Sequence, residues 1–221
     1  MSIDSLKNRL RSLPSLKGPF NELDMDQFPD TPQKAFQRWL DDAIEGGVTE
    51  PHAMTLSTVD SDGLPDARVL ILKNVDARGW HFAAKADSPK GKQLAKNPNV
   101  ALTFYWPALG RQIRLRGKAM MLPDAECADD FLTRPEGSKI SAVASRQSEI
   151  LESELELNKS LDEARTFLGR NPEHIELGWR VFVVQPTNIE FWQGATDRLH
   201  KRVIFSITAS EAGWQKQMLW P

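Results

Sequence analysis

The sequence predicts a mainly β protein with inserted helices, an α+β fold built on a Greek-key-like antiparallel barrel. Short segments of alternating apolar and polar residues recur from residue 53 onward, and turn residues separate them. Helical segments are inserted between them without a regular strand–helix–strand alternation, which disfavours a parallel, doubly wound sheet. A closed barrel suits many short antiparallel strands because it leaves no sheet edge exposed.

The chain is expected to consist of a flexible N-terminal arm, residues 1–30, followed by a single domain, residues 31–221. The arm is rich in proline and has no sustained hydrophobic period, apart from a short basic helix near residues 6–13. Thr31-Pro32 predicts the start of a helix, because threonine caps helices and proline is tolerated at their first position.

The remaining elements follow from hydrophobic period and turn residues. Strands are expected over residues 53–59, 67–73, 80–84, 100–106, 112–122, 179–185, 188–192, 203–207 and, at the end, 214–219. Helices are expected over residues 88–96, 124–133, 138–145 and 149–168.

Composition and charge narrow the class of function. The 221 residues are 40% hydrophobic, which suffices for one sizeable core, and the net charge of −2 gives no reason to expect nucleic acid or an anionic membrane as partner. No apolar run reaches membrane-spanning length and no signal segment is apparent, so we expect a cytoplasmic protein. The single cysteine, Cys127, excludes an intramolecular disulfide, and the four histidines share no metal-ligand spacing, so no metal site is expected.

The common nucleotide and hydrolase motifs are also missing. The sequence has no Gly-x-Gly-x-x-Gly after a strand, no Walker motif and no serine elbow.

Several short motifs instead occur in a specific order from about residue 36 to the C-terminus. They are Glu50-Pro51-His52-Ala53-Met54, Arg68–Lys73, Ser88-Pro89-Lys90-Gly91, Phe104-Tyr105-Trp106, Arg111-Gln112, Phe131–Pro135, Ser145–Ser148, Ile189–Gly194 and Arg198-Leu199-His200. In this order and spacing the chain resembles the pyridoxamine 5'-phosphate oxidase family. The resemblance implies an FMN-binding split β-barrel, a homodimer with FMN at its interface, and a small amine or alcohol as substrate.

The resemblance also implies which residues bind FMN. They are Arg68, Val69, Leu70, Lys73, Ser88, Lys90, Gln112, Gln147, Ser148, Trp192 and Arg202. These residue types suit the cofactor, because Arg68 can form a bidentate pair with the phosphate and Lys90 adds a point charge near a helix N-terminus. Taken alone, Arg68 or Lys73 would be read as a solvated strand-end charge and Trp192 as core.

For the substrate, the resemblance implies binding by Lys73, Arg134, Ser138, Arg198 and His200. Arg134 and Ser138 would hold the substrate phosphate, whereas Arg198 and His200 would flank the ring at the flavin face as the catalytic pair. The implied reaction oxidises pyridoxamine or pyridoxine 5'-phosphate to pyridoxal 5'-phosphate, with hydride transfer to the flavin and release of hydrogen peroxide.

The sequence departs from the family pattern at several positions. Asp130 stands where the family has a tyrosine that touches the substrate phosphate, and a carboxylate there would repel a dianion. The other departures are Ala83 and Ala84 at the end of a strand, Pro89 before the helix lysine, Lys201 after His200, and a C-terminus without the family's arginine. Lys85 and Lys201 are candidates to compensate for the lost phosphate contact.

Three functions therefore stay open. The first is an authentic pyridoxamine or pyridoxine 5'-phosphate oxidase. The second is an FMN oxidoreductase of the same family with a different, unphosphorylated planar substrate, a hypothesis motivated by Asp130. The third is a non-catalytic protein that binds flavin or vitamer.

Overall fold

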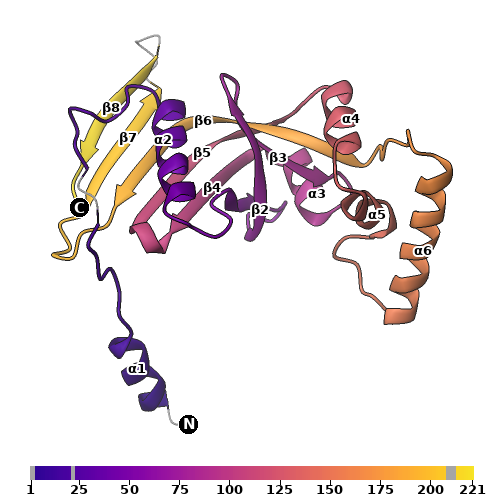
Figure 1. The fold of residues 1–221 in the computed structure, drawn as a ribbon, viewed down its shortest axis with the longest axis horizontal. Coiled ribbons are helices and arrows are strands. Elements are labelled where there is room, and N and C mark those ends of the chain that lie inside the picture. The colour runs from indigo at the N-terminus through magenta and orange to yellow at the C-terminus, as the bar shows by residue number, and fades with distance from the viewer. Residues whose placement is uncertain (1–2, 21–22, 208–212) are drawn as a thin grey trace. The chain divides into compact units, whose positions relative to one another are not determined.

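The computed structural model of the protein describes residues 3–20, 23–207 and 213–221. Over these residues the strands form one sheet of eight in the order β3-β2-β1-β4-β5-β6-β7-β8 (Figure 1). Every strand pair with a described register is antiparallel, and a further pairing of β3 with β6 closes β1–β6 into a six-stranded barrel. The predicted fold class is confirmed.

Contacts within the chain define two compact units, and three strands run through both. Unit 1 contains Met1–Pro51, Phe104–Arg114 and Asn188–Pro221, and unit 2 contains His52–Thr103 and Leu115–Thr187. The shared strands are β4 (Asn99–Trp106), β5 (Arg111–Met121) and β6 (Trp179–Gln193). The expected single domain over residues 31–221 stays a prediction.

Unit 1 packs the helix α2 against the strand β6. Its own elements are α1 (Ile3–Ser12), α2 (Pro32–Glu45), the 3-10 turn η1 (Pro107–Leu109), β7 (Lys201–Ile207) and β8 (Trp214–Leu219). The helix α2 begins as predicted, with the Thr31 side chain accepting a hydrogen bond from the Lys34 amide and proline in the first turn. Its Trp39 packs edge-on against Phe191 of β6 at 5.2 Å between ring centroids, and Phe28 lies against both rings.

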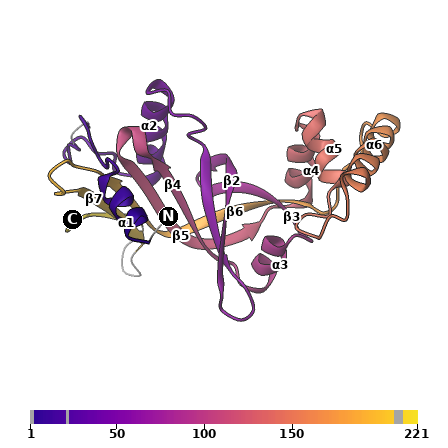
Figure 2. The same ribbon diagram turned by 90° about the horizontal axis from the view of Figure 1, so that it is seen from below.

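Unit 2 carries the first three strands and four helices. The strands are β1 (Ala53–Val59), β2 (Pro65–Asp76) and β3 (Gly79–Lys85), and the helices are α3 (Pro89–Lys96), α4 (Asp124–Leu132), α5 (Glu136–Ala144) and α6 (Glu154–Arg170). Alternate residues of β1 are buried, which is the pattern of a strand with one face in a core. The helices α4, α5 and α6 lie together in two perpendicular views (Figures 1 and 2).

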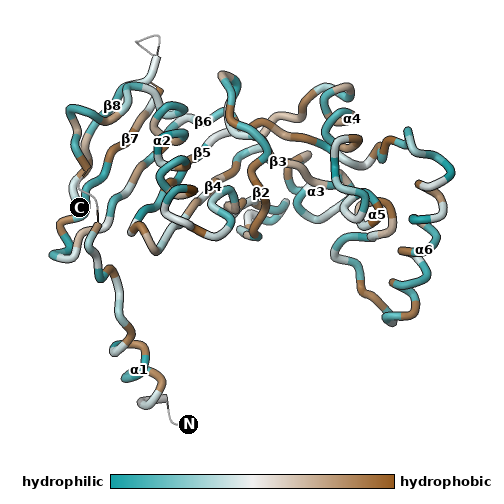
Figure 3. Tube along the Cα trace, viewed as in Figure 1, coloured by the Kyte–Doolittle hydropathy of each residue, from teal (hydrophilic) through white to brown (hydrophobic). Residues whose placement is uncertain are grey.

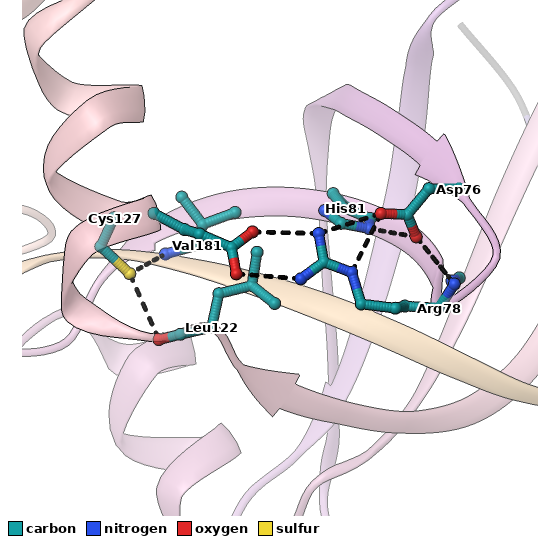
Figure 4. A network of polar contacts seen from close by, with 8 residues as sticks. Asp76, Arg78, His81, Leu122, Cys127 and Val181 are labelled. Carbon is teal, nitrogen blue, oxygen red and sulfur yellow. Dashed lines mark hydrogen bonds and ion pairs between the residues drawn. The ribbon is translucent and has the colours of Figure 1, made fainter.

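An ion-pair network joins the β2–β3 turn to α4 (Figure 4). Arg78 donates to Asp76 and, through both terminal nitrogens, to Glu126 at 2.9 and 3.0 Å, while the buried His81 lies 3.0 Å from Asp76. Nearby, the Cys127 thiol accepts a hydrogen bond from the Val181 amide at 3.3 Å, which makes it a structural thiol of the α4–β6 contact. Ala83 packs against the apolar cluster around Cys127, so one of the departures from the family pattern serves this core.

The boundaries of two elements, β6 and the last long helix, differ clearly from the predicted ones. The two strands expected over 179–185 and 188–192 are the single strand β6, which continues through Pro186. The last long helix starts at Glu154 instead of residue 149, because the Ser153 side chain caps it by accepting the Glu156 amide. Along this helix hydrophilic and hydrophobic residues alternate (Figure 3), and only Ala164 is fully buried.

Within the described residues, no helix has both the length and the apolar character needed to cross a membrane.

Candidate functional site

Arg68 is the first cation of a cluster in unit 2 that we call the Arg68–Lys90 cluster: Thr58, Arg68, Ser88, Lys90 and Gln147. Arg68 lies on β2, where Nη1 donates to the fully buried Thr58 hydroxyl at 2.6 Å. Its Nη2 pairs with Asp66, whose side chain is half exposed. The contact with Thr58 fixes the guanidinium beside β1, and its other partner, Asp66, is half exposed to solvent.

Lys90 is the second cation of the cluster, and it is 6% exposed. Its ammonium donates to Gln147 Oε1 at 2.7 Å and lies 3.4 Å from the Ser88 hydroxyl. Burial lowers the pKa of Lys90, and the positive charge of Arg68 lowers it further. Arg68 is near enough to affect the pKa of Lys90, and two such cations, one of them buried, form a candidate site for an anion, which would offset their repulsion.

The N-terminus of α3 adds backbone donors to this cluster. Ser88 caps the helix by accepting the Gly91 amide at 3.2 Å, and its hydroxyl donates to the Lys85 carbonyl at 2.7 Å. Gly91 is required here, because a Cβ would lie 2.3 Å from that carbonyl oxygen. The glycine thus lets the helix start lie directly on the end of β3, with Pro89 in the first turn.

Lys73, Asp130, Arg134 and Trp179 form a second group in unit 2, the Asp130 cluster. Asp130 on α4 pairs with Lys73 of β2 at 3.0 Å and accepts the Trp179 indole N–H at 2.8 Å. The Arg134 guanidinium stacks on the face of that indole at 3.8 Å and donates to the Ser138 carbonyl at 3.0 Å. Burial lowers the pKa of Arg134, and the carboxylate of Asp130 acts in the opposite direction.

In unit 1, Trp192, His200 and Arg202 lie together at the β6–β7 pair. Trp192 is directly opposite Arg202 across the two strands, and its ring centroid lies 4.8 Å from that of His200. Nδ1 of His200 accepts the Ala195 amide at 3.1 Å, so a neutral ring carries its hydrogen on Nε2. Arg202 donates to the buried Glu190 at 2.9 Å and to the Trp220 carbonyl.

Glu190 holds two arginines on neighbouring strands, Arg202 of β7 and Arg114 of β5. Burial opposes ionisation of Glu190, but the hydrogen bonds from Arg202 and Arg114 outweigh it and lower the pKa of this carboxyl. Arg202 is therefore fixed in place on its strand.

Arg198 and Ser148 share an unusual backbone conformation. Their φ angles are +70° and +71°, in the left-handed region that non-glycine residues rarely adopt. The Arg198 guanidinium lies 3.4 Å from the Ser15 hydroxyl, and the loop that carries it borders a hollow of about 590 Å³ lined in part by Pro19 and Phe20. Such strain is common in segments that present side chains to ligands.

The structure thus gathers the sequence-predicted residues into three groups. In the first group, hydrogen bonds link Lys90 to Ser88 and Gln147, and Arg68 acts on Lys90 through its charge. Lys73, Arg134 and Ser138 meet in the second group, and Trp192, His200 and Arg202 meet in the third. Of the other predicted residues, Leu70 and Gln112 are half-buried on β2 and β5, and Val69, Ser148 and Arg198 are exposed.

Lys85, a candidate replacement cation, is engaged elsewhere: its ammonium donates to the carbonyls of Ala142 and Ser145 at the end of α5. Sequence reasoning missed Thr58, Trp179 and Glu190. Only Glu190 carried a signal, as an acid inside the apolar Ile189–Gly194 motif.

The six-stranded closed barrel defines a split-barrel protein, and the Arg68–Lys90 cluster is its candidate site for an anionic ligand. The sequence profile described as pyridoxamine 5'-phosphate oxidase matches residues 40–177. The profile described as the C-terminal dimerisation region of pyridoxine 5'-phosphate oxidase matches residues 179–221. The chain belongs to the pyridoxamine 5'-phosphate oxidase family, a family of oxidoreductases.

Relatives cover nearly the whole chain. The pyridoxine/pyridoxamine 5'-phosphate oxidase of Salinibacter ruber is 38% identical over 205 residues, 90% of this chain and 94% of its own. That of Azorhizobium caulinodans is 42% identical over 207 residues, 92% and 97% of the two chains. The crystal structure of PhzG from Burkholderia lata 383 in complex with tetrahydrophenazine-1-carboxylic acid has a TM-score of 0.85 at 28% identity, covering 92% of this chain and all of that one.

Proposed function

We propose that this protein is an FMN-dependent oxidase that converts pyridoxamine or pyridoxine 5'-phosphate to pyridoxal 5'-phosphate, with oxygen as acceptor and hydrogen peroxide as product. The observation that carries the proposal is the Arg68–Lys90 cluster, where a buried ammonium at a helix N-terminus is affected by the charge of a second cation. Relatives about 40% identical bear the corresponding name, which supports the same chemistry here.

The residues of the Arg68–Lys90 cluster fit the phosphate of FMN. Arg68, Lys90 and the first amides of α3 would hold the dianion, whose charge would oppose the effect of burial that lowers the pKa of Lys90. Gln147 orients Lys90 by accepting its hydrogen bond, and Ser88 fixes the helix start. Gln112, Ser148, Trp192 and Arg202 are proposed to complete the flavin site, with Val69 and Leu70 on β2.

FMN, when bound, supplies the acceptor for a hydride from the substrate carbon and the route of those electrons to oxygen. The protein's own contribution is to bind and orient the substrate. In the proposal Lys73, Arg134 and Ser138 form the end that takes the anionic group. Arg198 and His200 flank the reacting ring, where Nε2–H of His200 acts as a donor because the Ala195 amide occupies Nδ1.

The proposal includes a homodimer with FMN at the interface between subunits. The match of residues 179–221 to a dimerisation region supports the homodimer. It also includes a location in the cytoplasm, where the one thiol, the buried Cys127, stays reduced.

The test is an oxidase assay on the purified protein. We expect a flavin absorption spectrum, oxygen uptake, and stoichiometric hydrogen peroxide and pyridoxal 5'-phosphate from either phosphorylated vitamer. Absence of turnover with both vitamers in protein loaded with FMN would rule the proposal out.

A second candidate is an FMN oxidoreductase with a different planar substrate. Asp130 favours it, because its carboxylate lies among the residues proposed to take the substrate phosphate. The related PhzG structure holds a tetrahydrophenazine carboxylic acid, which supports a planar carboxylate as an alternative class. Reduction of the flavin by such a compound under anaerobic conditions, and not by the vitamers, would establish this candidate. Reduction by no compound would leave a flavin- or vitamer-binding protein.

A further inference from the structure

Asp130 occupies the centre of the cluster that holds Lys73 and Arg134. One carboxylate oxygen lies 3.0 Å from the Lys73 ammonium and the other accepts the Trp179 indole N–H at 2.8 Å. The Asp130 side chain is 19% exposed and that of Lys73 is 31% exposed, so the pair lies at the edge of solvent. Both carboxylate oxygens have partners, and Asp130 is therefore held in this position.

The ion pair changes the charge that an arriving ligand meets. Lys73 and Arg134 together bring two positive charges, and Asp130 cancels one of them. The remaining cation, Arg134, stacks on Trp179, and its Nε is buried without a hydrogen-bond partner among the described residues. A buried donor of this kind is expected to find an acceptor in a ligand or in water.

We propose that Asp130 is a specificity-determining residue that leaves this cluster with one unbalanced positive charge, so that it takes a singly charged oxyanion in preference to a phosphate dianion. A dianion meets twice the attraction and twice the repulsion that a monoanion meets, but its cost of leaving water grows with the square of its charge. The attraction that Asp130 cancels is therefore needed more by the dianion than by the monoanion. A carboxylate and a phosphate monoanion share the required chemistry. The inference rests on the proposed function only in taking this cluster as the anionic end of the substrate site.

The test compares three unreactive probes in equilibrium titrations of the FMN-loaded protein at pH 7.5. The probes are 4-deoxypyridoxine, which lacks an anionic group, phenazine-1-carboxylate, which carries one charge, and 4-deoxypyridoxine 5'-phosphate, which carries nearly two. The variant is Asp130→Asn, which removes the charge and keeps an acceptor for the indole. Asp129→Asn is the matched control, because Asp129 is exposed on the same helix.

The expected result is a gain that grows with ligand charge. In Asp130→Asn, the Kd should fall about tenfold for the phosphate probe, about threefold for the carboxylate probe, and by less than about twofold for the uncharged one. Asp129→Asn should change each Kd by less than about twofold. Asp130→Ser, a smaller uncharged residue, should give the same order and so separate charge from fit.

Equal changes for the three probes, or no change, would overturn the inference. A wild-type Kd at least tenfold lower for the phosphate probe than for the carboxylate probe would also overturn it. Since the titrations need no turnover, they give a result even if neither vitamer is oxidised. If the protein oxidises pyridoxamine 5'-phosphate but the effect of Asp130→Asn does not grow with ligand charge, this inference fails and the proposed function stands.

Discussion

Lys90 combines burial with charge, and that combination has opposite consequences for stability and for binding. Burial and the nearby Arg68 lower its pKa, which means that the folded protein disfavours the ammonium. Lys90→Met keeps the apolar stem and removes the charge. We expect the Kd for FMN to rise about 10- to 100-fold, the scale of a lost charge-assisted hydrogen bond. The free energy of unfolding of the FMN-free protein should stay equal or rise.

Lys92→Met is the control for this prediction, because Lys92 lies exposed on the same helix. Fluorescence quenching of FMN measures the affinity, and urea unfolding without FMN measures the stability. Unchanged FMN affinity in Lys90→Met would contradict an anion-binding role. An equal loss in Lys92→Met would show that only the general charge of α3 matters.

At the scale of residues, the sequence singled out the members of one cluster but did not reveal the ion-pair partners of the others. The motif order singled out Ser88, Lys90 and Gln147, and these side chains do lie together. It did not reveal that Lys73 pairs with Asp130 or that Arg202 pairs with Glu190. These pairs depend on the fold bringing α4 within ion-pair distance of β2 and on the β6–β7 register, neither of which a local pattern contains.

Among the elements, the β2–β3 turn depends on a carboxylate. Burial opposes ionisation of Asp76, but hydrogen bonds from His81 and Arg78 outweigh it and lower its pKa from 3.8 to about 2. A lowered carboxyl pKa stabilises the fold above the unfolded value, and that stability is lost as pH falls through about 2. Asp76→Asn should therefore lower the free energy of unfolding by about 1–2 kcal/mol at pH 7, after allowance for partial exposure.

Urea unfolding at pH 7, 4 and 3 measures this effect. The difference between wild type and Asp76→Asn should be constant down to about pH 4 and should shrink below it. Asp62→Asn, in the exposed β1–β2 turn, should show no difference at any of these pH values. A difference that persists undiminished at pH 3 would mean that the Asp76 charge is not what stabilises the turn.

The close contact of α3 with the end of β3 requires a residue without a side chain at position 91. A Cβ on Gly91 would lie 2.3 Å from the Lys85 carbonyl oxygen and 2.5 Å from that of Ala86, so the helix must shift in Gly91→Ala. We expect a loss of about 1–3 kcal/mol in the free energy of unfolding, and weaker FMN binding because the helix N-terminus moves. Gly137→Ala in α5, with nothing within 4 Å of the new Cβ, should be neutral or slightly stabilising. Thermal and urea unfolding of both variants measure this difference. Equal losses of stability in Gly91→Ala and Gly137→Ala would exclude the spatial explanation.

The elements themselves were largely predictable, because period and caps are local. β1, α2 and α3 begin and end within a residue or two of their expected positions. The failures have tertiary causes. β6 continues through Pro186, although a proline in a local pattern predicts a strand break. Gly117 of β5 lies close to this part of β6, because a Cβ on it would be 2.1 Å from the Gln185 carbonyl oxygen.

At the scale of the molecule, the proposed site residues fall into both units. The Arg68–Lys90 and Asp130 clusters belong to unit 2, whereas Trp192, Arg198, His200 and Arg202 belong to unit 1. The match of the C-terminal strands to a dimerisation region supports a homodimer. Suppose that each FMN is held by unit 2 of one subunit and unit 1 of its partner. A subunit with a defective unit 2 and a subunit with a defective unit 1 can then form one intact site together.

Mixing Lys90→Met, defective in unit 2, with Arg198→Asn, defective in unit 1, tests this arrangement. Asparagine suits the positive φ of residue 198, so the loop is preserved while the guanidinium is lost. After unfolding and refolding an equal mixture, about half of the dimers are mixed, and each mixed dimer would hold one site with both defects and one intact site. About a quarter of all sites should then be active, against the low activity of either variant refolded alone. If each site is instead built within one subunit, the mixed dimers contain no intact site, and the refolded mixture stays at the mean of the two parent activities.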